Sequence, residues 1–71
     1  MKKKSKKLTS RECEIMECVI QGFDKKQIKE KLAISSDTVK NHFNSIYIKL
    51  ECHNQIQAIM KYLQIRQFYN T

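Results

Sequence analysis

Two capping boxes in this sequence fix the starts of two helices and limit the folds open to the chain. Thr9 is followed three residues later by Glu12, and Asp24 is followed three residues later by Gln27. In such a box, the two side chains accept hydrogen bonds from each other's free backbone N–H groups at a helix start. The 71 residues also include one Gly, no Pro and no long run of period two, so the sequence predicts an all-α domain.

Four helices are expected from these signals and from the spacing of apolar residues. The expected ranges are about 10–21, 25–32, 36–51 and 55–67. Gly22 is expected to end the first helix because it tolerates a left-handed backbone. Ala33 and Ile34 form a tight turn, and Ser35 and Asn54 are the expected N-caps of the last two helices.

The expected third helix has a narrow apolar side and an outward side with almost no acid. Its apolar side follows helical spacing through Val39, Phe43, Ile46 and Leu50. At about 100° per residue, the outward side is formed by Lys40, Asn41, Asn44 and Ser45. Lys suits guanine O6 and N7 and Asn suits adenine, so Lys40, Asn41 and Asn44 are predicted to contact bases. A short helix, a tight turn and a longer helix with a polar face are typical of a helix-turn-helix, whose second helix enters the major groove.

The net charge of +7 indicates a polyanionic partner, with nucleic acid ahead of an anionic membrane surface. Five of the cations lie in MKKKSKK, for which a tail that only keeps the protein soluble is the alternative. We expect a basic disordered arm at residues 1–7 and one domain at residues 8–71. Near the helix ends, phosphate contacts are expected at Lys25, Lys26, Thr38 and Lys49.

The expected fourth helix carries two apolar stripes. The first stripe is Ala58, Ile59, Tyr62 and Ile65, and the second is Ile56, Met60 and Leu63. A lone small domain has one core, so the second stripe either wraps around the first helix or meets another molecule. The pattern alone leaves both open.

Several function classes find no support in the sequence. Without an apolar run of 18 residues, no membrane span is expected, and MKKKSKK lacks the apolar segment of a secretory signal, so a cytoplasmic location is predicted. Cys13, Cys18 and Cys52 are odd in number and are expected to be reduced and structural, and Cys52–His53 is not a zinc pair. His42 has no nucleophile or acid partner nearby in sequence and is expected to be a packing residue or a phosphate neighbour. The sequence has no Gly-rich phosphate loop, catalytic triad or metal cluster, so neither an enzyme nor a cofactor is predicted.

Residues 8–63 resemble the LuxR-type, GerE-like helix-turn-helix domain, which is also the output domain of many response regulators. The resemblance is carried by LTSRE, the spacing to Gly22, QIKEKLAIS, TVKNH, the KL at 49–50 and the QA at 57–58. It implies a four-helix DNA-binding domain of a sequence-specific transcriptional regulator, with base-facing Lys40, Asn41 and Asn44. It further implies phosphate contacts at Lys26, Thr38 and Lys49. A homodimer on a two-fold site is implied through Ile56, Met60 and Leu63, and RNA polymerase is a further candidate partner.

The chain departs from this family at four positions. Lys29 stands where Ala is usual, so it is expected to extend outward or to splay the second and third helices. Ala33 replaces a common turn Gly and carries about 1 kcal/mol of strain if its backbone is left-handed. Asp24 brings a negative charge near phosphate, and Ile48 lies on the polar side of the third helix.

Two other readings of the same features stay open. A protein-interaction module or anti-regulator would use the second stripe of the fourth helix and Ile48 to bind a partner protein. A membrane-surface peptide would use the positive charge, but such peptides are usually single amphipathic helices. Both a complete small regulator and an excised output domain are compatible with the sequence.

Overall fold

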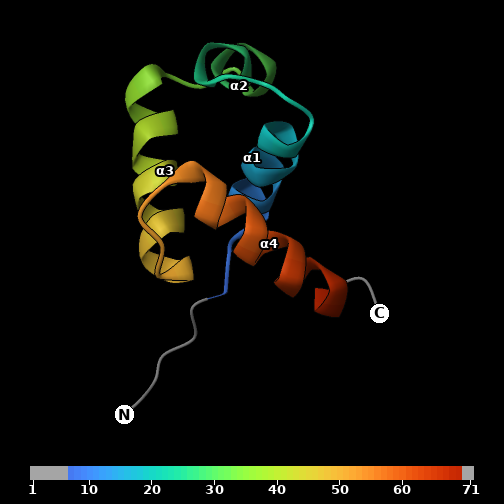
Figure 1. Ribbon diagram of the computed structural model, residues 1–71. Coiled ribbons are helices and arrows are strands. Elements are labelled where there is room, and N and C mark those ends of the chain that lie inside the picture. Colours follow the sequence, from blue (N-terminus) through green and yellow to red (C-terminus); the bar gives the residue numbers. More distant parts are fainter. Residues whose placement is uncertain (1–6, 70–71) are drawn as a thin grey trace.

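The computed structural model describes residues 7–69, which form four α-helices and no strand (Figure 1). The helices are α1 (Ser10–Ile20), α2 (Lys25–Leu32), α3 (Ser36–Leu50) and α4 (Gln55–Tyr69). The predicted all-α architecture and the four predicted helices are confirmed, and α4 runs two residues further than expected. The predicted basic arm lies outside the described residues except for Lys7.

Both predicted capping boxes are present. The Thr9 hydroxyl accepts a hydrogen bond from the Glu12 N–H at 3.1 Å, and the Thr9 N–H donates to the Glu12 carboxylate at 2.9 Å. At the start of α2, the Gln27 N–H donates to the Asp24 carboxylate at 2.8 Å, and the Asp24 N–H donates to Gln27 Oε1 at 2.9 Å. The other two predicted caps also accept hydrogen bonds, at Ser35 and Asn54. Local side-chain chemistry therefore fixes where all four helices begin.

Two helices end in a left-handed residue that is not Gly. Ala33 has φ 56° after α2, and Glu51 has φ 55° after α3. The left-handed turn at Ala33 is therefore real, and its strain is about 1 kcal/mol because the Cβ atom crowds the following carbonyl oxygen. The second turn, at Glu51, was not anticipated. Gly22, after α1, has φ 97°, as expected of a glycine stop.

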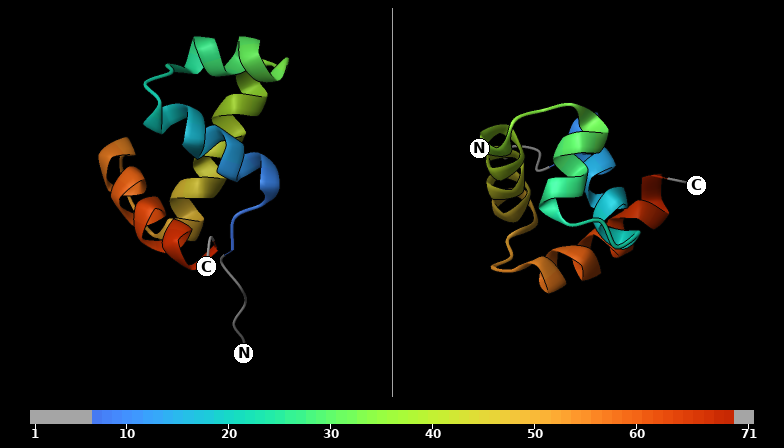
Figure 2. Two further views of the ribbon diagram at one scale, coloured as in Figure 1. Left: turned by 90° about the vertical axis from the view of Figure 1, so that its right-hand side faces the viewer. Right: turned by 90° about the horizontal axis from the view of Figure 1, so that it is seen from above.

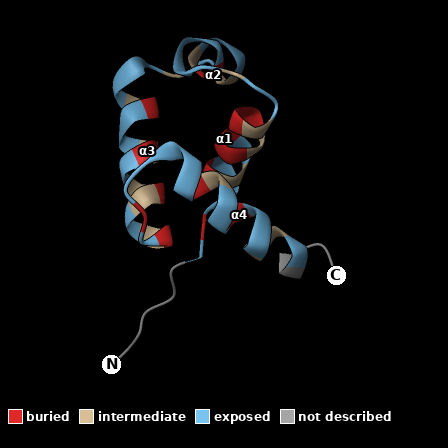
Figure 3. Ribbon diagram, in the orientation of Figure 1, coloured by how far each residue is buried: buried red, intermediate tan, exposed pale blue. Residues whose placement is uncertain are grey.

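The core lies where α1, α3 and α4 meet, and α2 closes the end remote from the two termini (Figures 1 and 2). Buried residues line the sides of α1 and α3 that face each other (Figure 3). All four residues of the predicted α3 stripe are buried: Val39, Phe43, Ile46 and Leu50. The opposite side of α3 is thereby turned to solvent along most of its length (Figure 3).

Candidate nucleic-acid interface

The outward side of α3 presents three polar side chains with no partner inside the described chain. Lys40, Asn41 and Asn44 are all exposed. No side chain of residues 7–67 makes a hydrogen bond or an ion pair with any of the three. Ile48 follows Asn44 by four residues on the same side and is 74% exposed. The predicted outward orientation of these three residues is confirmed, and their contact with bases stays a prediction.

Ser45 was expected on this outward side, and that expectation is wrong. The Ser45 side chain is half-buried, and its hydroxyl donates a hydrogen bond to Glu12 Oε2 at 2.7 Å. At about 100° per residue, Ser45 lies at the edge of the outward side rather than in its middle. The N-terminal turn of α1 covers that edge, so Ser45 serves the packing of α3 rather than its free surface.

Glu12 is the one buried charged residue among the described residues, with 3% of its surface exposed. Besides its cap, its carboxylate accepts hydrogen bonds from Ser45 and from the Lys49 ammonium at 2.8 Å. Burial raises the pKa of Glu12, but the hydrogen bonds from Lys49, from the Thr9 N–H and from Ser45 outweigh it and hold the pKa below its ordinary value. Glu12 therefore ties α1 to α3 as an ionised group.

Lys49 has an internal partner that the sequence did not reveal. Its ammonium pairs with Glu12, and 26% of its side chain remains exposed. The expected phosphate contact at Lys49 stays a prediction, but in the free protein its charge is already balanced. In the sequence, Glu12 already had a role in the capping box with Thr9, so nothing indicated that its carboxylate also binds Lys49.

The other predicted phosphate contacts gather where α2 and α3 begin. Lys25 and Lys26 are exposed on the first turn of α2, and the Lys25 ammonium lies 5.3 Å from the centre of the Phe43 ring. The Thr38 hydroxyl lies 2.9 Å from the Ser35 hydroxyl and thus belongs to the cap of α3. The two lysines remain available to an anion, whereas Thr38 already has a hydrogen-bond partner.

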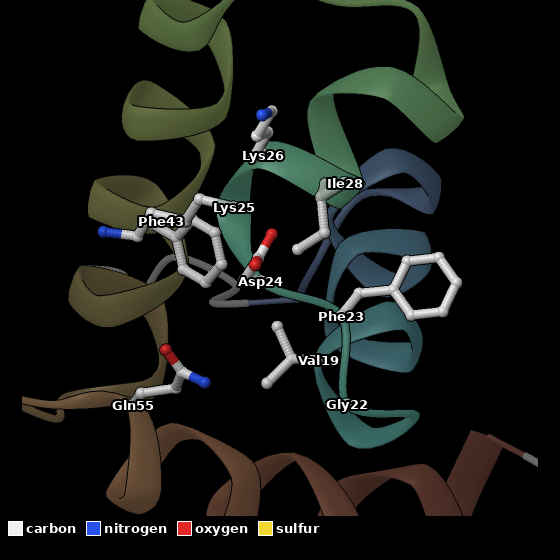
Figure 4. Close-up of a pocket in the computed structure, with 9 residues that line it drawn as sticks. All are labelled: Val19, Gly22, Phe23, Asp24, Lys25, Lys26, Ile28, Phe43 and Gln55. Atoms are coloured by element: carbon white, nitrogen blue, oxygen red, sulfur yellow. The ribbon is translucent and has the colours of Figure 1, made fainter.

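An open hollow of about 580 Å³ lies between the starts of α2 and α4 and the middle of α3 (Figure 4). Its lining residues are Val19, Gly22, Phe23, Asp24, Lys25, Lys26, Ile28, Phe43 and Gln55. Asp24 lies near the middle of the lining, and the Lys25 and Lys26 side chains extend away from its carboxylate (Figure 4). This mixed lining holds no cluster of metal ligands, and no group of three His, Cys, Asp or Glu that could bind a metal occurs within residues 7–69.

The second apolar stripe of α4 is exposed. Ile56, Met60 and Leu63 are 71%, 61% and 37% exposed. In the first stripe, Ala58 and Tyr62 are buried, with Ile59 and Ile65 packed against the core. Of the two alternatives for the second stripe, wrapping around α1 is therefore wrong.

A hydrogen-bonded cluster holds the core side of α4 against α1. The Tyr62 hydroxyl donates to Glu17 at 2.6 Å, and Arg66 donates to both oxygens of the same carboxylate at 3.0 and 3.1 Å. Burial and the bond to Glu17 raise the pKa of Tyr62, and the Tyr62 hydroxyl lowers the pKa of Glu17. These contacts leave the opposite side of α4 uncovered.

No helix within the described residues is long and apolar enough to cross a membrane. Cys13, Cys18 and Cys52 are free thiols, the last two buried. Neither observation indicates a functional site other than the surface formed by α2 and α3.

Comparisons with known proteins agree with this geometry. Residues 6–62 match the sequence profile of bacterial regulatory proteins of the luxR family. The chain is 44% identical over 54 residues to the transcriptional regulatory protein DesR of Bacillus subtilis (strain 168), covering 76% of this chain and 27% of DesR. It is 39% identical over 54 residues to the transcriptional regulatory protein DegU of Brevibacillus brevis, covering 76% of this chain and 23% of DegU. This chain thus spans about a quarter of the length of these relatives.

Among solved structures, the chain is similar to the response regulator ChrA of a heme-sensing two-component system. The TM-score is 0.84 with 41% sequence identity, over 90% of this chain and 32% of ChrA.

Proposed function

Because this chain belongs to the luxR family of bacterial regulatory proteins, a family of DNA-binding transcriptional regulators and not of enzymes, we propose that it reads specific DNA sequences through α3. Lys40, Asn41 and Asn44 contact base edges in the major groove, which is wide enough for one helix. Lys25, Lys26, Thr38 and Lys49 lie around this surface and contact phosphates. The cytoplasm, where bacterial DNA is found, is the expected location.

One observation carries this proposal: three hydrogen-bonding side chains stand on one exposed side of α3 without partners in the described chain. Side chains with unused donors and acceptors are free to bond to base edges without first breaking an internal contact. The side of α3 opposite to them is fully packed, so the helix is held rigidly behind its reading surface.

We further propose that two copies pair through the exposed stripe of α4, Ile56, Met60 and Leu63. Three neighbouring apolar side chains on one helix side form a surface that is stabilised by burial against a second copy. Such a pair is two-fold symmetric and suits an inverted-repeat site whose half-sites lie about one helical turn apart. RNA polymerase is a further candidate partner of the DNA-bound dimer.

Selection of bound sequences from a pool of random duplexes tests the proposal. The protein is incubated with the pool at fixed salt, and bound DNA is amplified and sequenced over several rounds. An enriched inverted repeat is expected, with conserved positions in each half-site. A pool that remains random after selection, while total DNA binding persists, contradicts sequence-specific reading.

The exposed apolar residues favour a second candidate, a protein-interaction module. Ile48 and the α4 stripe together offer apolar surface on two helices. Capture of partners from a nuclease-treated lysate separates the two candidates. A stoichiometric protein partner, from a chain that shows no affinity for duplex DNA, favours the module over the regulator.

A further inference from the structure

A groove of about 340 Å³ between α2 and α3 is lined by cations and by no acid. Its lining residues are Lys25, Lys26, Lys29, Ser36, Val39 and Lys40. Three of the four lysines come from one side of α2, at spacing i, i+1 and i+4, and the fourth comes from α3. The groove therefore concentrates positive charge from both helices of the helix-turn-helix.

Lys29 has no counter-charge among the described residues. It is partly buried, yet no carboxylate within residues 7–69 lies at ion-pair distance from it, and the same holds for Lys26 and Lys40. Elsewhere in the chain, the partly buried cations Lys49 and Arg66 are each paired with a glutamate. An ammonium that is partly desolvated and surrounded by like charges is stabilised by a bound anion.

From this placement we propose that the groove between α2 and α3 binds a DNA backbone phosphate, with Lys29 as a donor. The inference rests on the proposed function, because Lys40, on the groove's α3 side, is the predicted base reader. A strand whose bases face Lys40 would carry its phosphates past the α2 side of the groove, which is lined by Lys25, Lys26 and Lys29. Phosphate fits such a groove because its oxygens accept several ammonium hydrogen bonds at once.

A phosphate contact has a signature that a packing role lacks. It contributes equally to every DNA sequence, and it releases counterions, so removing it lowers the dependence of log affinity on log salt by about 0.9 per contact. A side chain that only fills space between α2 and α3 changes the melting temperature instead and leaves the salt slope as it was.

The test compares Lys29→Gln with Lys31→Gln by titration against a selected duplex and a scrambled duplex over a series of salt concentrations. Lys31 is a matched control on α2, since it is exposed and its ammonium lies over the Phe23 ring rather than in the groove. Lys29→Gln is expected to weaken both duplexes by roughly fivefold and to lower the salt slope by about one. Lys31→Gln and Lys29→Arg are both expected to show the same salt slope as the wild type, within experimental error.

The outcomes separate this inference from the proposed function. A wild type that prefers its selected duplex, together with an unchanged slope in Lys29→Gln, overturns the phosphate contact and leaves base reading intact. Equal slope losses in Lys29→Gln and Lys31→Gln also overturn it, as does a slope in Lys29→Arg as low as in Lys29→Gln. A wild type without affinity for any duplex removes both proposals together.

Discussion

Helices α3 and α4 have the same length, 15 residues, and each packs one side into the core, but their outward sides differ. The outward side of α3 is polar, with Lys40, Asn41 and Asn44, and Ile48 is its one large exposed apolar residue. The outward side of α4 carries an apolar stripe, Ile56, Met60 and Leu63, beside exposed glutamines and Lys61. The two exposed sides thus differ in chemistry, and this difference underlies the two proposals made above: DNA binding through α3 and pairing with a second copy through α4.

The same two helices also differ in how α1 holds them. The Glu12 side chain is 4% exposed and joins α1 to α3, whereas the Glu17 side chain is 38% exposed and joins α1 to α4. Removing one partner of a buried ion pair is strongly destabilising because the other charge remains buried without a partner. An exposed ion pair contributes only about 0–1 kcal/mol to the free energy of unfolding. The packing of α3 against α1 should therefore depend on Glu12 far more than the packing of α4 against α1 depends on Glu17.

The largest expected effect comes from Glu12→Gln. The change leaves the partly buried Lys49 ammonium without its counter-charge and weakens the bonds to Ser45, so we expect a loss of about 3 kcal/mol in the free energy of unfolding. Glu17→Gln is the matched control, with an expected loss of about 1 kcal/mol. Urea denaturation measures both, and equal losses would break the contrast between the two helices.

Next in size is the effect of Met60→Glu on self-association. In the proposed dimer, the introduced carboxylates of the two copies would lie close together and repel each other. This repulsion should weaken dimerisation by about 100-fold, or about 3 kcal/mol. The control is Ile48→Glu, which adds the same charge at an exposed apolar residue of α3. Analytical ultracentrifugation without DNA is expected to show a monomer for Met60→Glu only. Loss of the dimer in both variants would contradict the assignment of the interface to α4.

A smaller effect is expected from pH. The pKa of Glu12 is lowered in the folded protein, so its contribution to stability is present above about 4.5, the ordinary value, and is lost as pH falls through the folded pKa. The difference in unfolding free energy between the wild type and Glu12→Gln should therefore shrink below that pH. Denaturation curves at about pH 7 and about pH 3 check this, and a constant difference would show that the charge of Glu12 is unimportant.

The smallest effect is expected from Ala33→Gly at the turn between α2 and α3. Glycine adopts φ 56° without strain, which favours the variant by about 1 kcal/mol, partly offset by the greater freedom of glycine in the unfolded chain. The expected result is a small rise in the melting temperature with no change in DNA preference. A lower melting temperature would show that the methyl group of Ala33 contributes packing that outweighs its strain.

What the sequence predicted correctly depends on neighbours along the chain. The two capping boxes each join residues three positions apart, and the α3 stripe follows from helical spacing alone, so the helix bounds could be predicted well. The outward orientation of Lys40, Asn41 and Asn44 follows from the same geometry. Local rules were sufficient because the domain consists almost entirely of regular helix.

What the sequence did not predict depends on contacts between distant residues. Glu12 and Lys49 are 37 positions apart, and no spacing rule pairs them. Glu12 also accepts a hydrogen bond from Ser45, and the resulting cover over that edge of α3 could not be read from helical spacing. Lys29 was expected only to extend outward or to disturb packing, and its place in a cationic groove required the positions of both helices.

The most direct test of base reading by α3 is to repeat the duplex selection with Asn44→Ala beside the wild type. Asn44 is exposed and has no partner in the described chain, so the variant should fold normally. We expect the variant to lose the base preference at one position of each half-site, by about 1–3 kcal/mol, and to retain the remaining positions and their spacing. An identical selected sequence for both proteins would contradict the claim that this side of α3 contacts bases.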